Sequence, residues 1–341
     1  MTTVGDLGEF GLIARLTAAL PPHGGVVLGV GDDAALLDVG NATRLLVATC
    51  DAQVEGTHFR LTSATPEEIG RRVLAVNLSD IAAMGGIPQF ALISLLVPLD
   101  MDVAVLDGIY AGLRAEATQF GVAIVGGNVA RSERLVLDIT LLGSVARAGA
   151  LRRDGAHAGD ALLVTGTLGA AAAGLRLLED PTLAARLAAW DCQPLLAAQR
   201  TPVPRVAAGQ WLARHGATAA LDVSDGLAAD LAHLCAASGV GAVVQAAALP
   251  ISVATKAVAM ELGVVPEDLA LFGGEDYELL FTVPAEIADE LAENMLAEIE
   301  IPVTVIGHIQ AEGGLELARM GQKVPLAPKG WDHLRATHTT E

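Results

Sequence analysis

The feature that most restricts how this chain can fold is an apolar segment that ends in two adjacent carboxylates. Residues 26–28 have strand character, and residues 29–35 continue as GVGDDAA. The glycines and alanines leave Asp32 and Asp33 without bulky neighbours at a strand end. The spacing of Gly29, Gly31 and Ala34 matches a loose dinucleotide-binding pattern. The two carboxylates, however, would repel a pyrophosphate unless a divalent cation lay between the carboxylates and the phosphates. The segment therefore indicates a metal and phosphate site, and the alternative is an Asp-rich surface turn.

The same arrangement of an apolar strand followed by carboxylates recurs along the chain. Residues 44–49 form a buried-type strand that runs into Cys50 and Asp51, and residues 218–221 run into a DVSDG segment. Residues 65–84 predict a helix that begins with a Thr-Pro-Glu-Glu capping signal, and Asp80 lies in its apolar half. A buried carboxylate needs a partner, since an unpaired charge there would shift its pKa or unfold the site. The candidate metal ligands from this pattern are Asp33, Asp51, Asp80, Asp222 and Asp225.

Carboxylates that converge at one sheet edge require bound cations, because several like charges then share a small volume. A donor set of oxygen atoms, without a His or Cys group, favours Mg²⁺ or Mn²⁺ over zinc. Magnesium held by carboxylates commonly serves a nucleotide polyphosphate, and phosphoryl transfer depends chiefly on positioning and charge neutralisation. The alternative is five separate aspartates that are solvated or cap helices. Asp80 is the residue that this alternative explains least well.

Composition restricts the class of protein and of partner. The chain of 341 residues suits two domains, and its formal charge of -19 with 21 Lys and Arg residues disfavours nucleic acid and anionic membrane as partners. No apolar run is long enough to span a bilayer, and the start lacks a basic segment of the signal-peptide type. Cys50, Cys192 and Cys235 are scattered without CxxC spacing, so we expect a reducing compartment and take the cytoplasm as the default.

The order of predicted elements indicates an α/β protein with α+β layers around a mixed sheet. Helices are predicted over residues 10–20 and 102–120, and strands over 88–99, 122–125 and 135–145. Residues 147–160 are rich in Gly, Arg and Asp and interrupt the pattern, so we place an N-terminal domain at 1–148 and a C-terminal α/β domain at 149–341. The Gly-rich segment at 165–169 lacks the Gly-Lys-Ser/Thr of a phosphate loop and is interpreted as a structural turn.

Seven motifs in a fixed order make the sequence resemble the thiamine-monophosphate kinase family, within the aminoimidazole-ribonucleotide synthetase-like superfamily. The resemblance covers nearly the whole chain. The motifs are GDDAA at 31–35, TCD at 49–51, His58, NLSDIAAMG at 77–85, DVSDGL at 222–227, GGEDYEL at 273–279 and GWDH at 330–333. The resemblance implies an N-terminal domain that pairs through its sheet in a homodimer, and direct transfer of phosphate from ATP to thiamine monophosphate with Mg²⁺, giving thiamine diphosphate.

The resemblance also implies a role for individual residues. The magnesium ligands would be Asp33, Thr49, Cys50, Asp51, Asp80, Asn128, Asp222 and Asp225, of which Asp51, Asp80 and Asp225 are assigned to catalysis. ATP would be held by Gly126, Gly127, Arg153 and Ser224, and Tyr110 would line its pocket. Thiamine phosphate would contact His58, Glu275 and Trp331. A thiazolium cation suits an aromatic face and a carboxylate, and the phosphate acceptor is already an anion that needs no general base.

Two departures from the family pattern stand out. Asn128 follows Gly126 and Gly127 where the family usually has Asp, and Cys50 stands where a second hydroxyl residue is common. Two other functions are compatible with the residues. One is another ATP-using synthetase of the superfamily that activates an amide or selenide, although no Lys occurs before Lys256. The other is a non-catalytic acidic metal-binding protein, which would take up Mg²⁺ without consuming ATP.

Overall fold

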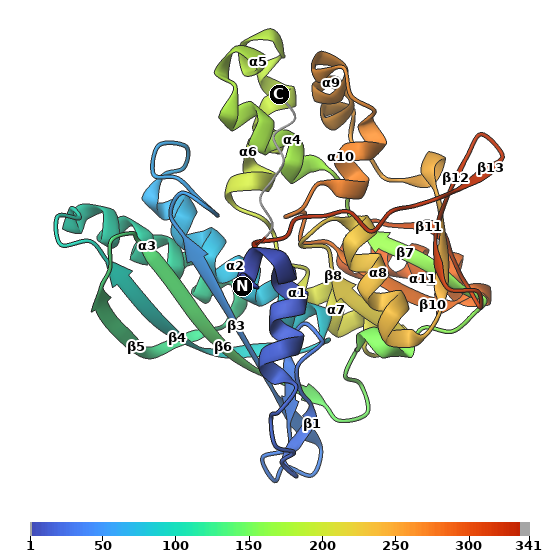
Figure 1. Cartoon of the computed structure of the whole chain (residues 1–341), viewed down its shortest axis with the longest axis horizontal. Coiled ribbons are helices and arrows are strands. Elements are labelled where there is room, and N and C mark those ends of the chain that lie inside the picture. Colours follow the sequence, from blue (N-terminus) through green and yellow to red (C-terminus); the bar gives the residue numbers. More distant parts are fainter. Residues whose placement is uncertain (1, 335–341) are drawn as a thin grey trace.

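The computed structural model describes residues 2–334 and contains two sheets with helices between and around them (Figure 1). The first sheet has the strand order β1-β2-β3-β6-β4-β5. Its neighbours are antiparallel except for β4 and β5, which are parallel, so the sheet is mixed as predicted. Its strands are β1 (Val26–Leu28), β2 (Ala35–Leu37), β3 (Arg44–Val54), β4 (Ile87–Val97), β5 (Ala123–Arg131) and β6 (Val136–Ala146).

Two long helices cover one face of this sheet. Helix α2 (Pro66–Ala83) begins with the capping box that the sequence predicts, in which the Thr65 hydroxyl accepts from the Glu68 N–H and the Glu68 carboxylate accepts from the Thr65 N–H. Helix α3 (Val103–Phe120) packs beside it, and the contact requires Gly70, where a Cβ would lie 1.9 Å from the Ile109 carbonyl oxygen. Nearly all of α2 is buried because the C-terminal domain covers its other side.

The opposite face of the first sheet is open and partly apolar. Phe90 and Leu92 on β4 are 47% and 40% exposed, and Val125 and Val129 on the edge strand β5 are 56% and 69% exposed. Strand alternation places the Cys50 side chain on this outer face, while Thr49 and Asp51 point toward α2. An exposed apolar patch of this kind marks an interaction surface.

The second sheet has the order β13-β12-β9-β11-β7-β10-β8 and is antiparallel except where β12 meets β9. Its strands are β7 (Asp160–Thr165), β8 (Ala219–Asp222), β9 (Gly241–Gln245), β10 (Leu279–Pro284), β11 (Val303–Gln310), β12 (Gly314–Arg319) and β13 (Gln322–Pro325). The helices of this half are α4 (Ala170–Glu179), α5 (Pro181–Arg186), α6 (Ala189–Arg200), α7 (Val206–Leu212), α8 (Leu227–Ser238), α9 (Val253–Leu262), α10 (Pro266–Phe272) and α11 (Ala288–Ile299), with short 3₁₀ turns η1 (Arg153–Gly155), η2 (Ala246–Ala248) and η3 (Ala285–Ile287).

The termini of the described chain meet near the junction of the two halves. Helix α1 (Val4–Thr17) has a kink at Gly8, where φ is 68°, and lies beside the C-terminal segment (Figure 1). The Glu9 N–H donates to Asp332 at 3.2 Å, and the His333 N–H donates to Glu9 at 3.4 Å. None of the helices within residues 2–334 combines the length and the apolar character that a membrane crossing would require.

The apolar segment before Asp32 and Asp33 forms the short edge strand β1 of the first sheet. Val26 and Val27 of β1 are 45% and 44% exposed, and Val30 is 63% exposed. The carboxylates nevertheless turn inward, because Gly31 has φ of 122° and reverses the chain immediately before them.

Candidate active site

A cavity of about 1690 Å³ lies between the two halves and is lined by α1, β3, α2, the loop after β8, and the loop that precedes β10. Each of these segments delivers polar side chains to the cavity. The sheets alone could not enclose such a space, so the cavity depends on how the two halves pack across α2. This is a large volume for a small-molecule site, since such pockets commonly measure about 300–1,000 Å³, and it has room for a nucleotide and a second substrate.

Three carboxylates from distant parts of the sequence form the innermost group. Oxygen atoms of Asp33, Asp80 and Asp222 all lie within 4.8 Å of one another. The Asp33 side chain is 1% exposed, and its Oδ2 is buried without a hydrogen-bond partner. A buried acceptor without a donor is costly, and a divalent cation is the partner that an all-oxygen set of this kind suits. The residues therefore fit Mg²⁺.

Helix α2 positions much of this group through one turn of its C-terminal half. The Thr49 hydroxyl on β3 donates to Asp80 Oδ2 at 2.5 Å. Asn77 accepts from the Asp51 N–H at 3.1 Å, and the Ser79 hydroxyl donates to Asp222 Oδ2 at 2.6 Å. Residues 77–80 of α2 thus form hydrogen bonds with both domains. These bonds explain why Asn77, Ser79 and Asp80 occur in an otherwise apolar helix.

The pKa values of this group show that its negative charges outweigh the nearby positive charge. Burial raises the pKa of Asp80 well above its usual range, and the charges of Asp51, Asp222 and Asp33 add to the effect. Burial, followed by the charge of Asp33, raises the pKa of Asp222 to about 8. Burial is also the main cause of the raised pKa of Asp51. Carboxyls in such a state exchange protons for a cation when one binds.

Within residues 2–334, Arg153 is the arginine that forms ion pairs with this group. Its Nη2 forms an ion pair with Asp33 Oδ1, and its backbone N–H donates to Asp32 Oδ2 at 3.1 Å. The neighbouring carboxylates raise the pKa of the Arg153 guanidinium, while burial opposes this. The pKa of Asp32 rises to about 6, chiefly through burial and then through the charge of Asp33. One guanidinium beside several carboxylates leaves the group acidic.

The loop after β8 is held by a second loop, which contains the GGEDYE motif. The Glu275 N–H donates to the Ser224 carbonyl at 2.7 Å, and the Tyr277 N–H donates to the Val223 carbonyl at 2.9 Å. Asp230 at the start of α8 accepts from the N–H groups of Asp225 and Gly226, at 3.1 and 3.0 Å. These bonds fix Asp225, whose pKa is raised to about 6, mainly by burial.

Aromatic and imidazole groups form the outer part of the cavity. The His58 Nδ1 accepts from the Val54 N–H at 3.0 Å, and its ring centre lies 4.9 Å from that of His333. Trp331 donates through its indole N–H to His333 at 3.0 Å and is 44% exposed. Burial lowers the pKa of His58. This part of the cavity offers the flat faces of aromatic and imidazole rings.

The structure brings together most of the residues that the sequence predicted for the site. Those that line the common cavity are Asp33, Thr49, Cys50, Asp51, His58, Asp80, Arg153, Asp222, Ser224, Asp225, Glu275 and Trp331. The Cys50 thiol itself contacts Asp138 Oδ1 at 3.0 Å on the outer face of the sheet. Four predicted residues do not line this cavity: Tyr110, Gly126, Gly127 and Asn128.

Those four residues lie in the first domain, on α3 and on β5. Tyr110 packs against the core of this domain. Gly127 is required by packing, because a Cβ there would lie 1.8 Å from the Ile93 carbonyl oxygen. In the register of the sheet, Asn128 of β5 lies opposite Ser94 of β4, and Ser94 lies opposite Asp138 of β6. Gly126, Gly127 and Asn128 lie on the edge strand β5 and Tyr110 lies on the covered side of the sheet, so the predicted roles of all four stay predictions.

Sequence reasoning missed several polar residues of the cavity. Arg72 and Gln199 contact Glu275, Glu9 projects from α1, and Asp230 holds the loop after β8. Arg72 could have been found from the sequence, because a charged residue within the apolar stretch of a helix needs a partner of opposite charge. Gln199 carried no signal, because its partner is 76 residues away in the sequence.

The Gly-rich segment at 165–169 is a structural turn, as predicted. It leads into α4, whose first N–H groups are taken by the chain itself. The Asp276 carboxylate accepts from Gly169 N–H at 2.6 Å and from Ala171 N–H at 3.2 Å. The helix N-terminus is the usual place for a phosphate, and an internal carboxylate occupies it here. Burial raises the pKa of Asp276 to about 7.

Comparison with known proteins agrees with this architecture. Residues 31–145 match the family described as "AIR synthase related protein, N-terminal domain", and residues 157–319 match "AIR synthase related protein, C-terminal domain". The fold and the acidic site between the two halves therefore define an AIR synthase-related protein.

Full-length relatives narrow the family. The thiamine-monophosphate kinase of Aquifex aeolicus is 36% identical over 96% of this chain and 98% of its own length, and that of Escherichia coli O157:H7 is 40% identical over 96% and 98%. The solved structure "AaThiL complexed with AMPPCP and TMP" matches with a TM-score of 0.84 at 35% identity, over 98% of this chain and 99% of that one. The chain belongs to the thiamine-monophosphate kinase family.

Proposed function

We propose that this protein is an ATP-dependent kinase that transfers the γ-phosphate of ATP to the phosphate of thiamine monophosphate, yielding thiamine diphosphate and ADP. One observation carries the proposal above all: three buried carboxylates, one with an unpartnered oxygen, meet in a cavity large enough for two substrates. The family to which the chain belongs, and a relative whose structure is described with AMPPCP and TMP, support this choice of substrates.

Magnesium is the cofactor that we propose for the acidic group. Asp33, Asp80 and Asp222 would hold it, with Asp51 and Asp225 beside them, and the cation would supply the positive charge that a polyphosphate requires. Arg153 would add a fixed positive charge next to Asp33. A phosphate oxygen of the acceptor would form the new bond to the γ-phosphorus as the bond to ADP breaks. The residues of the chain serve this step by positioning, because a phosphate acceptor needs no general base.

The outer part of the cavity suits the organic rings of thiamine monophosphate. His58 and Trp331 present the flat faces of their rings. Glu275 presents its carboxylate, and its side chain is 27% exposed. A thiazolium cation is attracted by aromatic faces, and ring amino groups donate to carboxylates. The substrate roles of these residues are part of the proposal.

A homodimer formed through the open face of the first sheet belongs to the same proposal. Phe90, Leu92 and Val125 supply exposed apolar surface on this face. Pairing of two such faces would bury them, and it would also give Gly126 and Asn128 a neighbouring chain to contact. The predicted roles of Tyr110, Gly126, Gly127 and Asn128 in binding ATP and metal fit such an arrangement. A cytoplasmic location is proposed with it, and the three free cysteines are in keeping with a reducing compartment.

A kinase assay with thiamine monophosphate and with free thiamine, each with Mg²⁺ and ATP, tests the proposal. We expect turnover of the monophosphate and little of thiamine, because the hydroxyl of thiamine lacks a charge that binds metal and a base to deprotonate it. Comparable turnover of both acceptors would contradict the assignment. Uptake of Mg²⁺ without consumption of ATP would favour the non-catalytic alternative, and turnover only with a different acceptor would favour another enzyme of the superfamily.

A further inference from the structure

The carboxylate of Glu275 is held by two residues to which the proposed function gives no role. Arg72 donates from Nη2 to Glu275 Oε1, and Gln199 donates from Nε2 to Oε2 at 2.7 Å. Arg72 also donates from Nη1 to the Gln199 carbonyl oxygen. Arg72 comes from α2 and Gln199 from α6, so each oxygen of the carboxylate has a donor from a different domain.

The backbone of Glu275 is fixed as firmly as its side chain. Its φ is 70°, a conformation that residues with a Cβ rarely adopt, and its N–H donates to the Ser224 carbonyl at 2.7 Å. Unfavourable backbone conformations persist where the surroundings impose them, and they gather at functional sites. Glu275 is thus placed relative to the metal-binding loop through its backbone, and relative to α2 through Arg72.

Arg72 and Gln199 each bury a polar atom that has no hydrogen-bond partner, which a purely stabilising contact would avoid. Arg72 and Gln199 are 2% and 6% exposed, yet Arg72 Nε and Gln199 Oε1 are buried without a hydrogen-bond partner. Buried polar atoms without partners reduce stability. Glu275, in contrast, keeps part of its surface toward the cavity.

We infer that Arg72 and Gln199 are positioning residues that fix the Glu275 carboxylate for an N–H donor of the organic substrate, and so set the affinity for thiamine monophosphate rather than for ATP. The inference rests on the proposed function. Arg72 balances the charge of Glu275, so the carboxylate serves as an oriented acceptor and not as a free anion. The amino group on the pyrimidine ring of the substrate is a donor that such an acceptor would bind.

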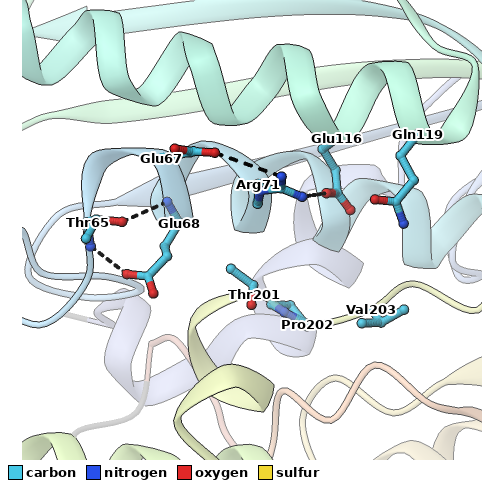
Figure 2. Close-up of a pocket in the computed structure, with 9 residues that line it drawn as sticks. All are labelled: Thr65, Glu67, Glu68, Arg71, Glu116, Gln119, Thr201, Pro202 and Val203. Carbon is cyan, nitrogen blue, oxygen red and sulfur yellow. Dashed lines mark hydrogen bonds and ion pairs between the residues drawn. The ribbon is translucent and has the colours of Figure 1, made fainter. Parts of the chain in front are cut away.

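Helix α2 supplies a matched control one residue away. Arg71 points into a separate groove of about 410 Å³, away from Glu275. There it contacts Glu116 at 3.4 Å and Glu67 at 3.9 Å (Figure 2). Arg71→Gln and Arg72→Gln therefore remove the same charge from the same helix, but only the second removes a donor to Glu275.

Steady-state kinetics of the full-length protein test the inference. We expect Gln199→Met and Arg72→Gln to raise the KM for thiamine monophosphate by about tenfold, the effect of losing one hydrogen bond to a charged group, with the KM for ATP within about twofold of wild type. Arg71→Gln should leave both values unchanged, and Arg72→Lys should recover part of the loss. Because Arg72→Gln removes a buried charge and can unfold the chain, Gln199→Met, which keeps the size of the side chain, is the deciding variant.

The outcomes separate this inference from the proposed function. A wild-type protein without activity on thiamine monophosphate would refute the proposed function itself. An active wild type whose Gln199→Met variant keeps its KM for thiamine monophosphate would refute the positioning role and leave the kinase assignment intact. Equal rises in the KM for both substrates would show that Gln199 only maintains the fold, and would also overturn the inference.

Discussion

Replacing Asp80 with Asn should stabilise the metal-free protein while abolishing phosphoryl transfer. The Asn side chain keeps the size of Asp and can still accept from the Thr49 hydroxyl, which lies 2.5 Å from Asp80 Oδ2. What it removes is one charge from a group whose oxygens lie within 4.8 Å of one another. Two unit charges about 5 Å apart repel by roughly 3 kcal/mol at an effective dielectric constant of about 20.

The size of the effect depends on pH, because Asp80 avoids part of this repulsion by binding a proton. The pKa of Asp80 in the folded protein is raised well above its usual range by burial and by the neighbouring carboxylates, and the pKa of Asp222 is raised to about 8. Between the unfolded and folded pKa values the folded state binds more protons than the unfolded state, so the stability of the metal-free protein falls as pH rises through this window. We expect Asp80→Asn to gain about 1–3 kcal/mol at pH 8 and almost nothing at pH 5.

Thermal unfolding in the presence of a chelator measures this difference. A gain of 1 kcal/mol corresponds to about 2–4 °C in a domain of about 150–250 residues, so a gain of about 1–3 kcal/mol should raise Tm by roughly 2–12 °C at pH 8. Adding Mg²⁺ should raise the Tm of the wild type more than that of Asp80→Asn, because the variant has lost the negative charge of one ligand. Asp100→Asn, a change at an exposed position, should alter neither Tm nor its response to Mg²⁺. A lower Tm for metal-free Asp80→Asn at pH 8 would refute the reasoning and make Asp80 a structural residue.

Three further variants test other parts of the structure. Glu278→Gln breaks an ion pair in which Arg205 Nη2 lies 2.5 Å from Oε1 of the buried Glu278 carboxylate. The Arg205 side chain is 23% exposed, so we expect a cost of about 3 kcal/mol in urea unfolding, at the low end for buried pairs; an unchanged midpoint would contradict this. Asp276→Ala removes the carboxylate that caps α4 and should cost about 1–2 kcal/mol, measured in the same way, whereas a cost near zero would mean that water replaces the cap. Phe90→Asp should convert the proposed dimer to a monomer in light scattering, and a dimer that persists would place the interface elsewhere.

The parts of the fold that the sequence predicted well are those decided by local chemistry. The start of α2 depends on Thr65, Pro66 and Glu68, and all three act within one helical turn, so the capping box follows from neighbouring residues alone. The placement of Asp222 at the end of β8 is equally local. The predicted strand end at Asp51 was wrong, because β3 continues to Val54 through its pairing with β6. The mixed sheet and the two-domain α/β class also follow from the order of the elements, and the structure confirms both.

The parts that escaped prediction are decided by contacts between distant segments. Strands β9, β12 and β13 were not predicted. Strands β9 and β12 are short and pair with each other across about 70 residues, and β13 has four exposed residues without an apolar pattern. Arg72 reaches residues 127 and 203 positions away, and no local pattern contains that information. The outward side chain of Cys50 required the register of β3 against β6, which places it opposite Thr140.

Helix α2 links the chemistry of the site to the way in which the two halves pack. Its inward residues contact β3 through Asn77, the end of β8 through Ser79, and Glu275 through Arg72. A shift of α2 would therefore move the acidic group and the carboxylate proposed for the organic substrate together. Because Asp80 belongs to the first domain and Asp222 to the second, their repulsion also opposes the packing of the domains, and a cation that neutralises both would strengthen it. Metal binding should therefore favour the arrangement of the domains that forms the substrate pocket, because α2 belongs to both sites.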